Sequence, residues 1–275
     1  MLEKKNLKKW LTMYNLVEIP ATINLPISLK KLKDFALYAL DHRFFRKYRY
    51  YSKILEGYHD IHKGERCFIV GTGPSLKKTN IKLLKNETVF GVNTLYKGLK
   101  DFGITCRYYA VSDLKVWEGH YRKILPLDTT LFISSFVGKE YINNQKKYRQ
   151  YQKKEPLVLR TKGYITVCKN FSKDISKYVI NGHSVVADIC LQVAYYMGFK
   201  EVYLVGCDYS NIGYRWDGSK TENVKTVGLT NWEKIFYAFE ICRKAFEKDG
   251  REIINATVGG ELNVFKRKSL EEIIA

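Results

Sequence analysis

One short stretch of the chain joins an apolar, strand-like run to a glycine-rich turn. The run Phe68–Val70 is followed directly by Gly71-Thr72-Gly73-Pro74-Ser75. The two glycines allow a sharp turn and a close approach to a ligand, and Pro74 suits the first turn of a helix. Free N–H groups at such a helix start can bind a phosphate. The stretch predicts an α/β fold with an anion site, with an ordinary strand-to-helix turn as the alternative.

The turn lacks parts of the two common phosphate-binding motifs. The third glycine of the dinucleotide fingerprint is missing, as is an acidic residue at the right place on the next strand. The Gly-Lys-Ser/Thr of the P-loop is also absent. We therefore expect a phosphate site of another kind.

Short apolar runs alternate with amphipathic stretches from Arg66 onward, which is typical of βαβ proteins with a mainly parallel sheet. The predicted strands are Cys67–Val70, Thr88–Val92, Tyr108–Val111, Thr130–Ser134, Lys177–Ile180, Val202–Val205 and Glu252–Asn255. Apolar periodicity predicts helices over 184–197 and 231–248. We expect one Rossmann-like domain over residues 64–275.

Two segments depart from this pattern. Residues 1–63 alternate Lys and Arg with aromatic residues, and an apolar helical stripe begins after Ser28. We expect a basic helical arm that lies on an anionic membrane surface or packs on the core or a second subunit. Residues 138–177 are rich in Lys, Tyr, Asn and Gln. We interpret them as a lid or acceptor-side insertion, with a solvated charged helix as the alternative.

The formal net charge of +19 predicts an anionic partner. A nucleotide, a nucleic acid, an acidic glycan or an anionic membrane would each fit. No RNA- or DNA-reading motif is present, so a nucleic-acid-binding protein is only the alternative of another class. The six cysteines occur without a C-x-x-C pair, which predicts buried free thiols in a reducing compartment. With no apolar run long enough to span a membrane, we expect a cytoplasmic protein, peripheral on the inner face of the cell membrane if the arm binds lipid.

Polar residues follow most of the predicted strands. Ligands of open α/β sheets bind beyond the carboxyl ends of the strands, so these residues are site candidates. They are Asn93-Thr94, Ser112-Asp113, Ser134-Ser135, Asn181-Gly182-His183-Ser184 and Gly206-Cys207-Asp208-Tyr209. Each could also be an ordinary helix cap. Their joint placement favours a pocket lined with hydrogen-bond donors and one or two carboxylates.

Several blocks of the chain resemble the 6-hydroxymethylpterin diphosphokinase MptE-like domain family. They are Phe68–Leu76, Phe90–Asn93, Gly182–Asp208 and Asn255–Leu262, with Met197–Asp208 the most specific. The family includes motility accessory factor glycosyltransferases linked to nonulosonic acids. It is related in pattern to the small bacterial sialyltransferases of glycosyltransferase family 42. The resemblance covers residues 65–275, leaves 1–63 outside, and implies a sialyltransferase variant of the GT-A-like fold.

In those sialyltransferases the glycine-rich turn and the Asn after the second strand hold a CMP-sugar, and two tyrosines bind the departing phosphate. The resemblance implies a phosphate pair of Tyr209 and Tyr214. Fixed hydroxyl donors stabilise charge on a leaving phosphate, so no metal is expected. The residues that we expect to bind nucleotide are Gly71, Thr72, Gly73, Pro74, Ser75, Asn93, Ser134 and Ser184.

The chain departs from that pattern at two positions. The sialyltransferases have an Asn within the turn where this chain has Thr72, so one donor contact is altered. Their general base is a His beyond the tyrosine pair, and this chain has no His after His183. His183 is therefore our candidate base, with Asp113 and Asp208 as alternatives. Asp208 could instead be a structural acceptor for backbone amides.

We expect a glycosyltransferase that moves a sialic-acid-like nonulosonate from a CMP-sugar donor to a glycan or lipid-linked acceptor by direct displacement. Such a reaction, as in surface polysaccharide biosynthesis, requires no cofactor. The alternative enzyme is a diphosphokinase of the 6-hydroxymethylpterin type, which would use ATP with Mg²⁺ held by Asp113 and Asp208. A homo-oligomer is compatible with either function.

Overall fold

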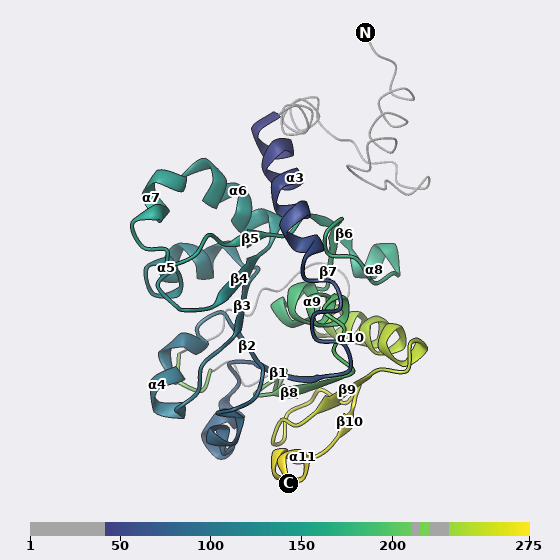
Figure 1. Cartoon of the computed structure of the whole chain (residues 1–275). Helices are drawn as coiled ribbons and strands as arrows, with labels where there is room; N and C mark the ends of the chain where they lie inside the picture. The colour runs from purple at the N-terminus through teal and green to yellow at the C-terminus, as the bar shows by residue number, and fades with distance from the viewer. Residues whose placement is uncertain (1–41, 211–214, 220–230) are drawn as a thin grey trace.

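The computed structural model describes residues 42–210, 215–219 and 231–275 (Figure 1). An eight-stranded sheet with the order β10-β9-β8-β1-β2-β3-β4-β5 forms its centre, and all its neighbouring strands are parallel. Its strands are β1 (Arg66–Val70), β2 (Val89–Val92), β3 (Tyr108–Val111), β4 (Thr130–Ile133), β5 (Leu157–Val158), β8 (Glu201–Val205), β9 (Glu252–Asn255) and β10 (Lys266–Arg267). A separate parallel pair joins β6 (Thr161–Tyr164) to β7 (Val179–Asn181).

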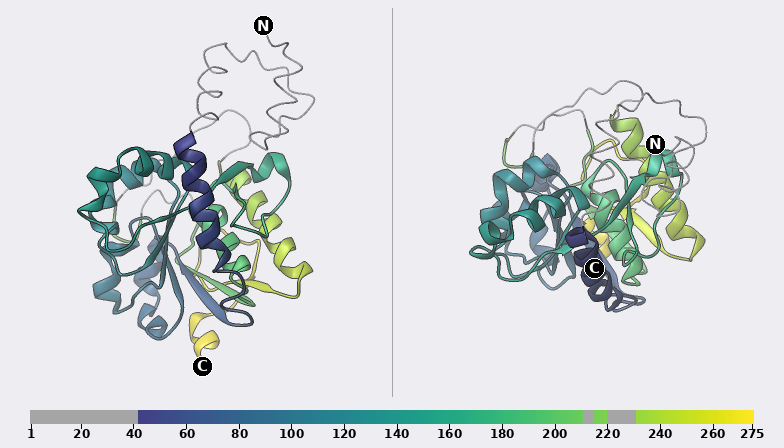
Figure 2. Two further views of the ribbon diagram at one scale, coloured as in Figure 1. Left: turned by 45° about the horizontal axis from the view of Figure 1, so that its top comes forward. Right: turned by 90° about the horizontal axis from the view of Figure 1, so that it is seen from above.

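Helices cover both faces of the large sheet, with α4 to α7 on one side and α3, α9 and α10 on the other (Figures 1 and 2). The helices are α3 (His42–Glu56), α4 (Leu99–Phe102), α5 (Leu114–Ile124), α6 (Ser135–Asn143), α7 (Gln145–Arg149), α8 (Ile165–Cys168), α9 (Leu191–Tyr196), α10 (Asn231–Lys248) and α11 (Leu270–Ile274). Short 3-10 helices are η1 (Pro74–Lys78), η2 (Ile81–Leu84) and η3 (Leu95–Lys97), and η4 (Val186–Cys190) is π-helical.

The predicted single Rossmann-like α/β fold with a mainly parallel sheet is confirmed. Every residue of β2 and β3 is buried, which explains why these strands are continuous apolar runs and not alternating ones. The predicted strands Tyr108–Val111 and Glu252–Asn255 coincide with β3 and β9. The others differ by one residue at one end, except Lys177–Ile180, which differs from β7 at both ends. The short strands β5, β6 and β10 were not predicted.

The predicted helix over 184–197 is present, but its first half is the π-helical turn η4, and only the second half, α9, is a regular α-helix. Gln192 lies in α9, and its side chain accepts a hydrogen bond from the Ile180 N–H at 2.9 Å and donates to the Ile180 carbonyl at 2.7 Å. The same amide donates to the carbonyl oxygens of Ala187 and Asp188. Carbonyls that a regular α-helix would pair internally are thus satisfied by a side chain.

The described part of the N-terminal arm packs on the core. Tyr51 and Leu55 of α3 are almost fully buried, and the Tyr51 hydroxyl donates to Glu155 at 2.7 Å. Ser28 and the rest of residues 1–41 lie outside the described residues. None of the described helices is long and apolar enough to cross a bilayer.

The segment 138–177 contains α7, β5, β6, α8 and most of α6. Tyr141 and Tyr148 are buried, and their rings pack against Trp117 of α5 with centroids 6.1 and 5.4 Å away. Residues that look like a polar insertion in sequence therefore complete one side of the large sheet. All six cysteines are free, and all except Cys168 are buried.

Candidate functional site

The order of the strands reverses at β1. The chain runs from β1 outward through β2 to β5, whereas β8, β9 and β10 lie on the other side of β1. The turns after β1 and β8 therefore meet at a topological switch point, the usual ligand position in open α/β sheets. The glycine-rich turn is one of these two turns.

Gly71 and Gly73 are required by contact between the two turns. Their N–H groups donate to the carbonyls of Val205 and Gly206, both at 2.8 Å. A Cβ on Gly71 would lie 2.4 Å from the Gly206 oxygen, and one on Gly73 would lie 1.7 Å from a carboxylate oxygen of Asp208. Both distances are far inside van der Waals contact. The two glycines are thus explained by packing before any ligand is considered.

The helix after the turn is short. The structure has a five-residue 3-10 helix, η1, with Pro74 in its first turn. The predicted helix start after the turn is present, but so few peptide units sum to only a small dipole. The Thr72 carbonyl accepts from the Trp216 N–H at 3.1 Å, so residues 215–219 lie against this turn.

Asp208 bridges the two turns. Its carboxylate accepts from the Ser75 N–H at 3.0 Å and from the Ser75 hydroxyl at 2.7 Å. Burial raises the pKa of Asp208, and the hydrogen bonds from Ser75 oppose that rise. Asp208 thus accepts a backbone N–H, as a structural acceptor would, and its role as a base stays a prediction.

Asn93 presents a buried acceptor at the same edge. It follows β2 in the left-handed region, with φ of 49°, and its own carbonyl accepts from the Tyr109 hydroxyl at 2.8 Å. The side-chain oxygen of Asn93 is buried and has no hydrogen-bond partner among the described residues. A buried acceptor without a donor costs free energy, so this oxygen favours a ligand that supplies an N–H or O–H group.

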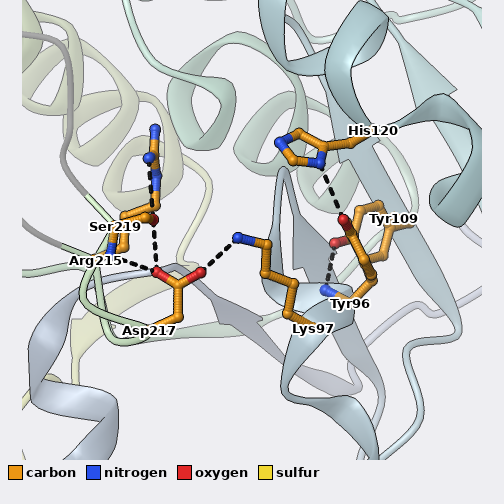
Figure 3. Close-up of polar contacts among 7 residues, drawn as sticks. All are labelled: Tyr96, Lys97, Tyr109, His120, Arg215, Asp217 and Ser219. Atoms are coloured by element: carbon orange, nitrogen blue, oxygen red, sulfur yellow. Dashed lines mark hydrogen bonds and ion pairs between the residues drawn. The ribbon is translucent and has the colours of Figure 1, made fainter.

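Shortly after Asn93 in the chain, η3 carries two residues of a polar cluster that we call the Lys97 cluster (Figure 3). It comprises Tyr96, Lys97, His120, Arg215, Asp217 and Ser219. The Lys97 amine is 2.6 Å from Asp217, and the Tyr96 hydroxyl is 3.0 Å from Nδ1 of His120. Although burial acts to raise the pKa of Asp217, hydrogen bonds from Lys97 and Ser219 hold it below its usual range.

His120 is the residue of this cluster with acid–base capacity near neutral pH. Burial lowers its pKa, and the charges of Lys97 and Arg215 lower it further. Its imidazole is therefore neutral at pH 7 and able to accept a proton. Sequence reasoning missed His120 because no local motif marks it. The cluster depends on η3, α5 and residues 215–219 meeting in space.

His183, Ser184 and Tyr209 come together across the turns after β7 and β8. The Tyr209 hydroxyl donates to the Ser184 hydroxyl oxygen at 3.2 Å. The His183 ring stacks on Tyr164, with centroids 5.2 Å apart and planes 17° apart. Burial and the nearby Lys234 lower the pKa of His183, which keeps its imidazole neutral. Tyr214, the second predicted phosphate ligand, lies outside the described residues.

Burial raises the pKa of Tyr209 well above its usual value, so its hydroxyl stays protonated and able to donate. Its ring packs edge-on against Phe239 of α10, with centroids 5.1 Å apart. A donor that is held by packing suits stabilisation of a leaving phosphate.

Asp188 is a buried carboxyl that the sequence analysis missed. It lies in η4 and accepts from the Gly182 N–H. Burial raises its pKa to about 7, although hydrogen bonds from Gly182, Ser112, Ser184 and His183 act to lower it. In sequence, Asp188 is only one polar position in a predicted helix.

The remaining predicted residues are helix caps. Asp113 is exposed and caps α5 by accepting from the Val116 N–H at 3.0 Å. Ser134 caps α6 and donates to the Ser112 carbonyl at 2.9 Å. The predicted residues thus separate into two groups, one at the β1–β8 switch point with Asn93 and one around His183, with Asp113 and Ser134 holding helix starts.

The chain is similar to one protein family and to one solved structure. The family model "6-hydroxymethylpterin diphosphokinase MptE-like" matches residues 42–213, starting within α3 and so including part of the arm that the sequence resemblance had left outside. No curated protein matches. Among solved structures, the MAf glycosyltransferase from Magnetospirillum magneticum AMB-1 is similar, with 15% identity, a TM-score of 0.48, and coverage of 98% of this chain and 47% of that chain. The chain thus spans about half the length of that glycosyltransferase. Because the family model matches more than half of the chain, the protein belongs to the 6-hydroxymethylpterin diphosphokinase MptE-like family.

Proposed function

We propose that the protein is a glycosyltransferase that moves a sialic-acid-like nonulosonate from CMP to a glycan or lipid-linked acceptor. The observation that carries the proposal is the buried side-chain oxygen of Asn93, which has no donor among the described residues. It lies at the edge where a nucleotide is expected, and a cytosine amino group or a ribose hydroxyl would supply the missing hydrogen bond.

The chemistry is a displacement at the anomeric carbon of the sugar. The acceptor oxygen forms the new bond, the bond from that carbon to the phosphate oxygen breaks, and CMP leaves with the electron pair. The acceptor proton passes to a base. The hydroxyl of Tyr209 stays protonated, and by turning from Ser184 to the phosphate it would stabilise the charge that develops there.

The base is proposed to be His183. His183→Ala is expected to lower kcat by about 100-fold or more, because general bases contribute factors of this size, while CMP binding is kept. His59→Ala is the matched control, since His59 is an exposed His that contacts Asp60 away from the site. Full activity of His183→Ala together with loss of activity in His120→Ala would move the base to the Lys97 cluster. The measurement is turnover with a CMP-nonulosonate.

Nucleotide binding is tested by thermal stabilisation. We expect CMP to stabilise the protein without metal, by about 2.7 kcal/mol at 100 times its Kd. Single-stranded RNA is expected to have no such effect. A response only to ATP with Mg²⁺ would favour the diphosphokinase reaction that the family name describes, with Asp113 and Asp208 as carboxylates, and would overturn the proposal.

Asn93→Gly links this test to the site. Glycine adopts the left-handed conformation of Asn93 without strain and removes only the amide, so folding is expected to persist. The CMP affinity should fall about tenfold, the value of one lost hydrogen bond of about 1.4 kcal/mol. Asn80→Gly, an exposed position before η2, is the control and should bind CMP as the wild type does. Unchanged affinity in Asn93→Gly would contradict the assigned role.

The location and assembly of the protein stay predictions. A cytoplasmic position at the inner face of the membrane fits an acceptor carried on lipid, and the basic residues of the arm fit anionic headgroups. A homo-oligomer is compatible with this arrangement.

A further inference from the structure

A pocket of about 340 Å³ lies between α3 and the segment that carries β5, β6 and the start of β7. Figures 1 and 2 show α3 passing beside these strands. None of its lining residues belongs to the switch-point site, the Lys97 cluster or the His183 turn. The residues that line it are Tyr48, Arg49, Ser52, Leu55, Val158, Arg160, Lys162, Ile175, Ser176, Lys177 and Tyr178. The pocket is therefore a separate feature of the fold.

The charges of this pocket have one sign. Its lining includes Arg49, Arg160, Lys162 and Lys177, and among the described residues no Asp or Glu lines it. Lys177 contacts Asp174 at 2.9 Å, and that carboxylate lies outside the lining of the pocket. A concave surface lined by cations concentrates anions, and the mutual repulsion of the cations falls when an anion enters.

The remaining walls define the kind of anion. Leu55, Val158 and Ile175 are buried and form an apolar floor. Hydroxyl groups come from two tyrosines and two serines of the lining. The Lys162 amine lies 5.1 Å from the centroid of the Tyr178 ring, which places a cation at an aromatic wall. Cations and hydroxyls above an apolar floor suit a phosphate group attached to a carbon skeleton.

The size of the pocket limits the ligand further. Small-molecule sites span about 300–1,000 Å³, so a volume of 340 Å³ fits one phosphorylated small group and not a nucleic acid. Four cationic side chains favour a ligand that carries more than one negative charge. We propose that the pocket between α3 and the β5–β7 segment binds a diphosphate group, carried either on a soluble molecule or at the head of a lipid.

The experiment measures binding of inorganic pyrophosphate to the full chain by calorimetry. In the double variant Arg160→Gln, Lys177→Gln the affinity is expected to fall about 100-fold, or about tenfold for each charge-assisted contact removed. The charge-matched control is Lys146→Gln, Arg149→Gln, which removes two exposed cations of α7 and should leave the affinity unchanged. Arg49→Gln, an exposed position on α3, is a second pocket variant that does not disturb the β5–β7 segment.

Geranyl diphosphate separates the two sources of the ligand. If it binds more tightly than pyrophosphate and loses affinity in the same variants, the diphosphate belongs to a lipid; equal affinities assign it to a soluble molecule. Equal loss of affinity in the pocket variants and the control, or no binding by the wild type, would overturn the inference. The result is independent of the proposed transferase activity, because CMP stabilisation is expected to be the same in all these variants.

Discussion

Gly73→Ala is expected to destabilise the protein by about 3–5 kcal/mol, because a Cβ at this position has no room. The new atom would lie 1.7 Å from an Asp208 carboxylate oxygen and 2.7 Å from the Gly206 carbonyl oxygen. Asp208 cannot move aside without releasing both hydrogen bonds from Ser75. The total stability of a domain is only about 5–15 kcal/mol, so a loss of this size would raise the fraction of unfolded molecules at 37 °C. Urea denaturation measures the loss.

Gly119→Ala is the matched control for this substitution. Gly119 lies in α5, and a Cβ there would meet nothing within 4 Å. Alanine favours a helix over glycine, so this variant should be more stable than the wild type by about 0.5–1 kcal/mol. If Gly73→Ala were as stable as Gly119→Ala, the close contact between the turns after β1 and β8 would be wrong.

The contribution of Asp188 to the stability of the protein is expected to fall as the pH rises from about 4 to about 7. Burial raises the pKa of this carboxyl from 3.8 to about 7 in the folded state. Between these two values the folded state binds more protons than the unfolded state, so the free energy of unfolding decreases with rising pH. At about 1.36 kcal/mol for each pKa unit, the loss approaches about 4 kcal/mol by pH 7.

Asp188→Asn removes this titration and keeps an oxygen that can accept from the Gly182 N–H. The difference in unfolding free energy between wild type and variant should therefore shift in favour of the variant across that pH range. Asp128→Asn is the comparison, since Asp128 is an exposed carboxyl whose pKa is lowered by hydrogen bonds from Lys154 and Lys153 and which titrates below the window. If the difference in unfolding free energy between the wild type and Asp188→Asn did not change with pH, Asp188 would be charged throughout this pH range.

The fold could be predicted from sequence where burial is complete and local. β3 and β9 are short apolar runs bounded by polar residues, so their ends are visible in the sequence. β5 has two residues and gains its place by pairing with β4, which no pattern within Leu157–Val158 reveals. The π-helical turn η4 is accompanied by hydrogen bonds from the Gln192 side chain to the backbone of Ile180. The helical periodicity of apolar residues contains no information about such contacts.

The candidate site was predictable only where local sequence patterns mark its residues. Asn93 directly follows β2 and Asp208 lies three residues beyond the end of β8, so both were found, because strand ends meet at one edge of a parallel sheet. What each side chain does there depends on a partner from another part of the chain. Ser75 turns Asp208 into a structural acceptor, and Tyr96 brings His120 into a polar cluster. Those partners become neighbours only through the tertiary fold.

The position of β1 at the middle of the sheet has a consequence for biosynthesis. Arg66 of β1 pairs in register with Glu201 of β8, so β1, the first strand of the described residues to be synthesised, has one open edge until that much later strand arrives. Pairing over such a separation is slow, and an uncovered apolar strand edge invites association with other chains. A nascent chain that stops before β8 therefore exposes this edge, and completion of β8 both closes it and creates the switch point at which the nucleotide is expected to bind.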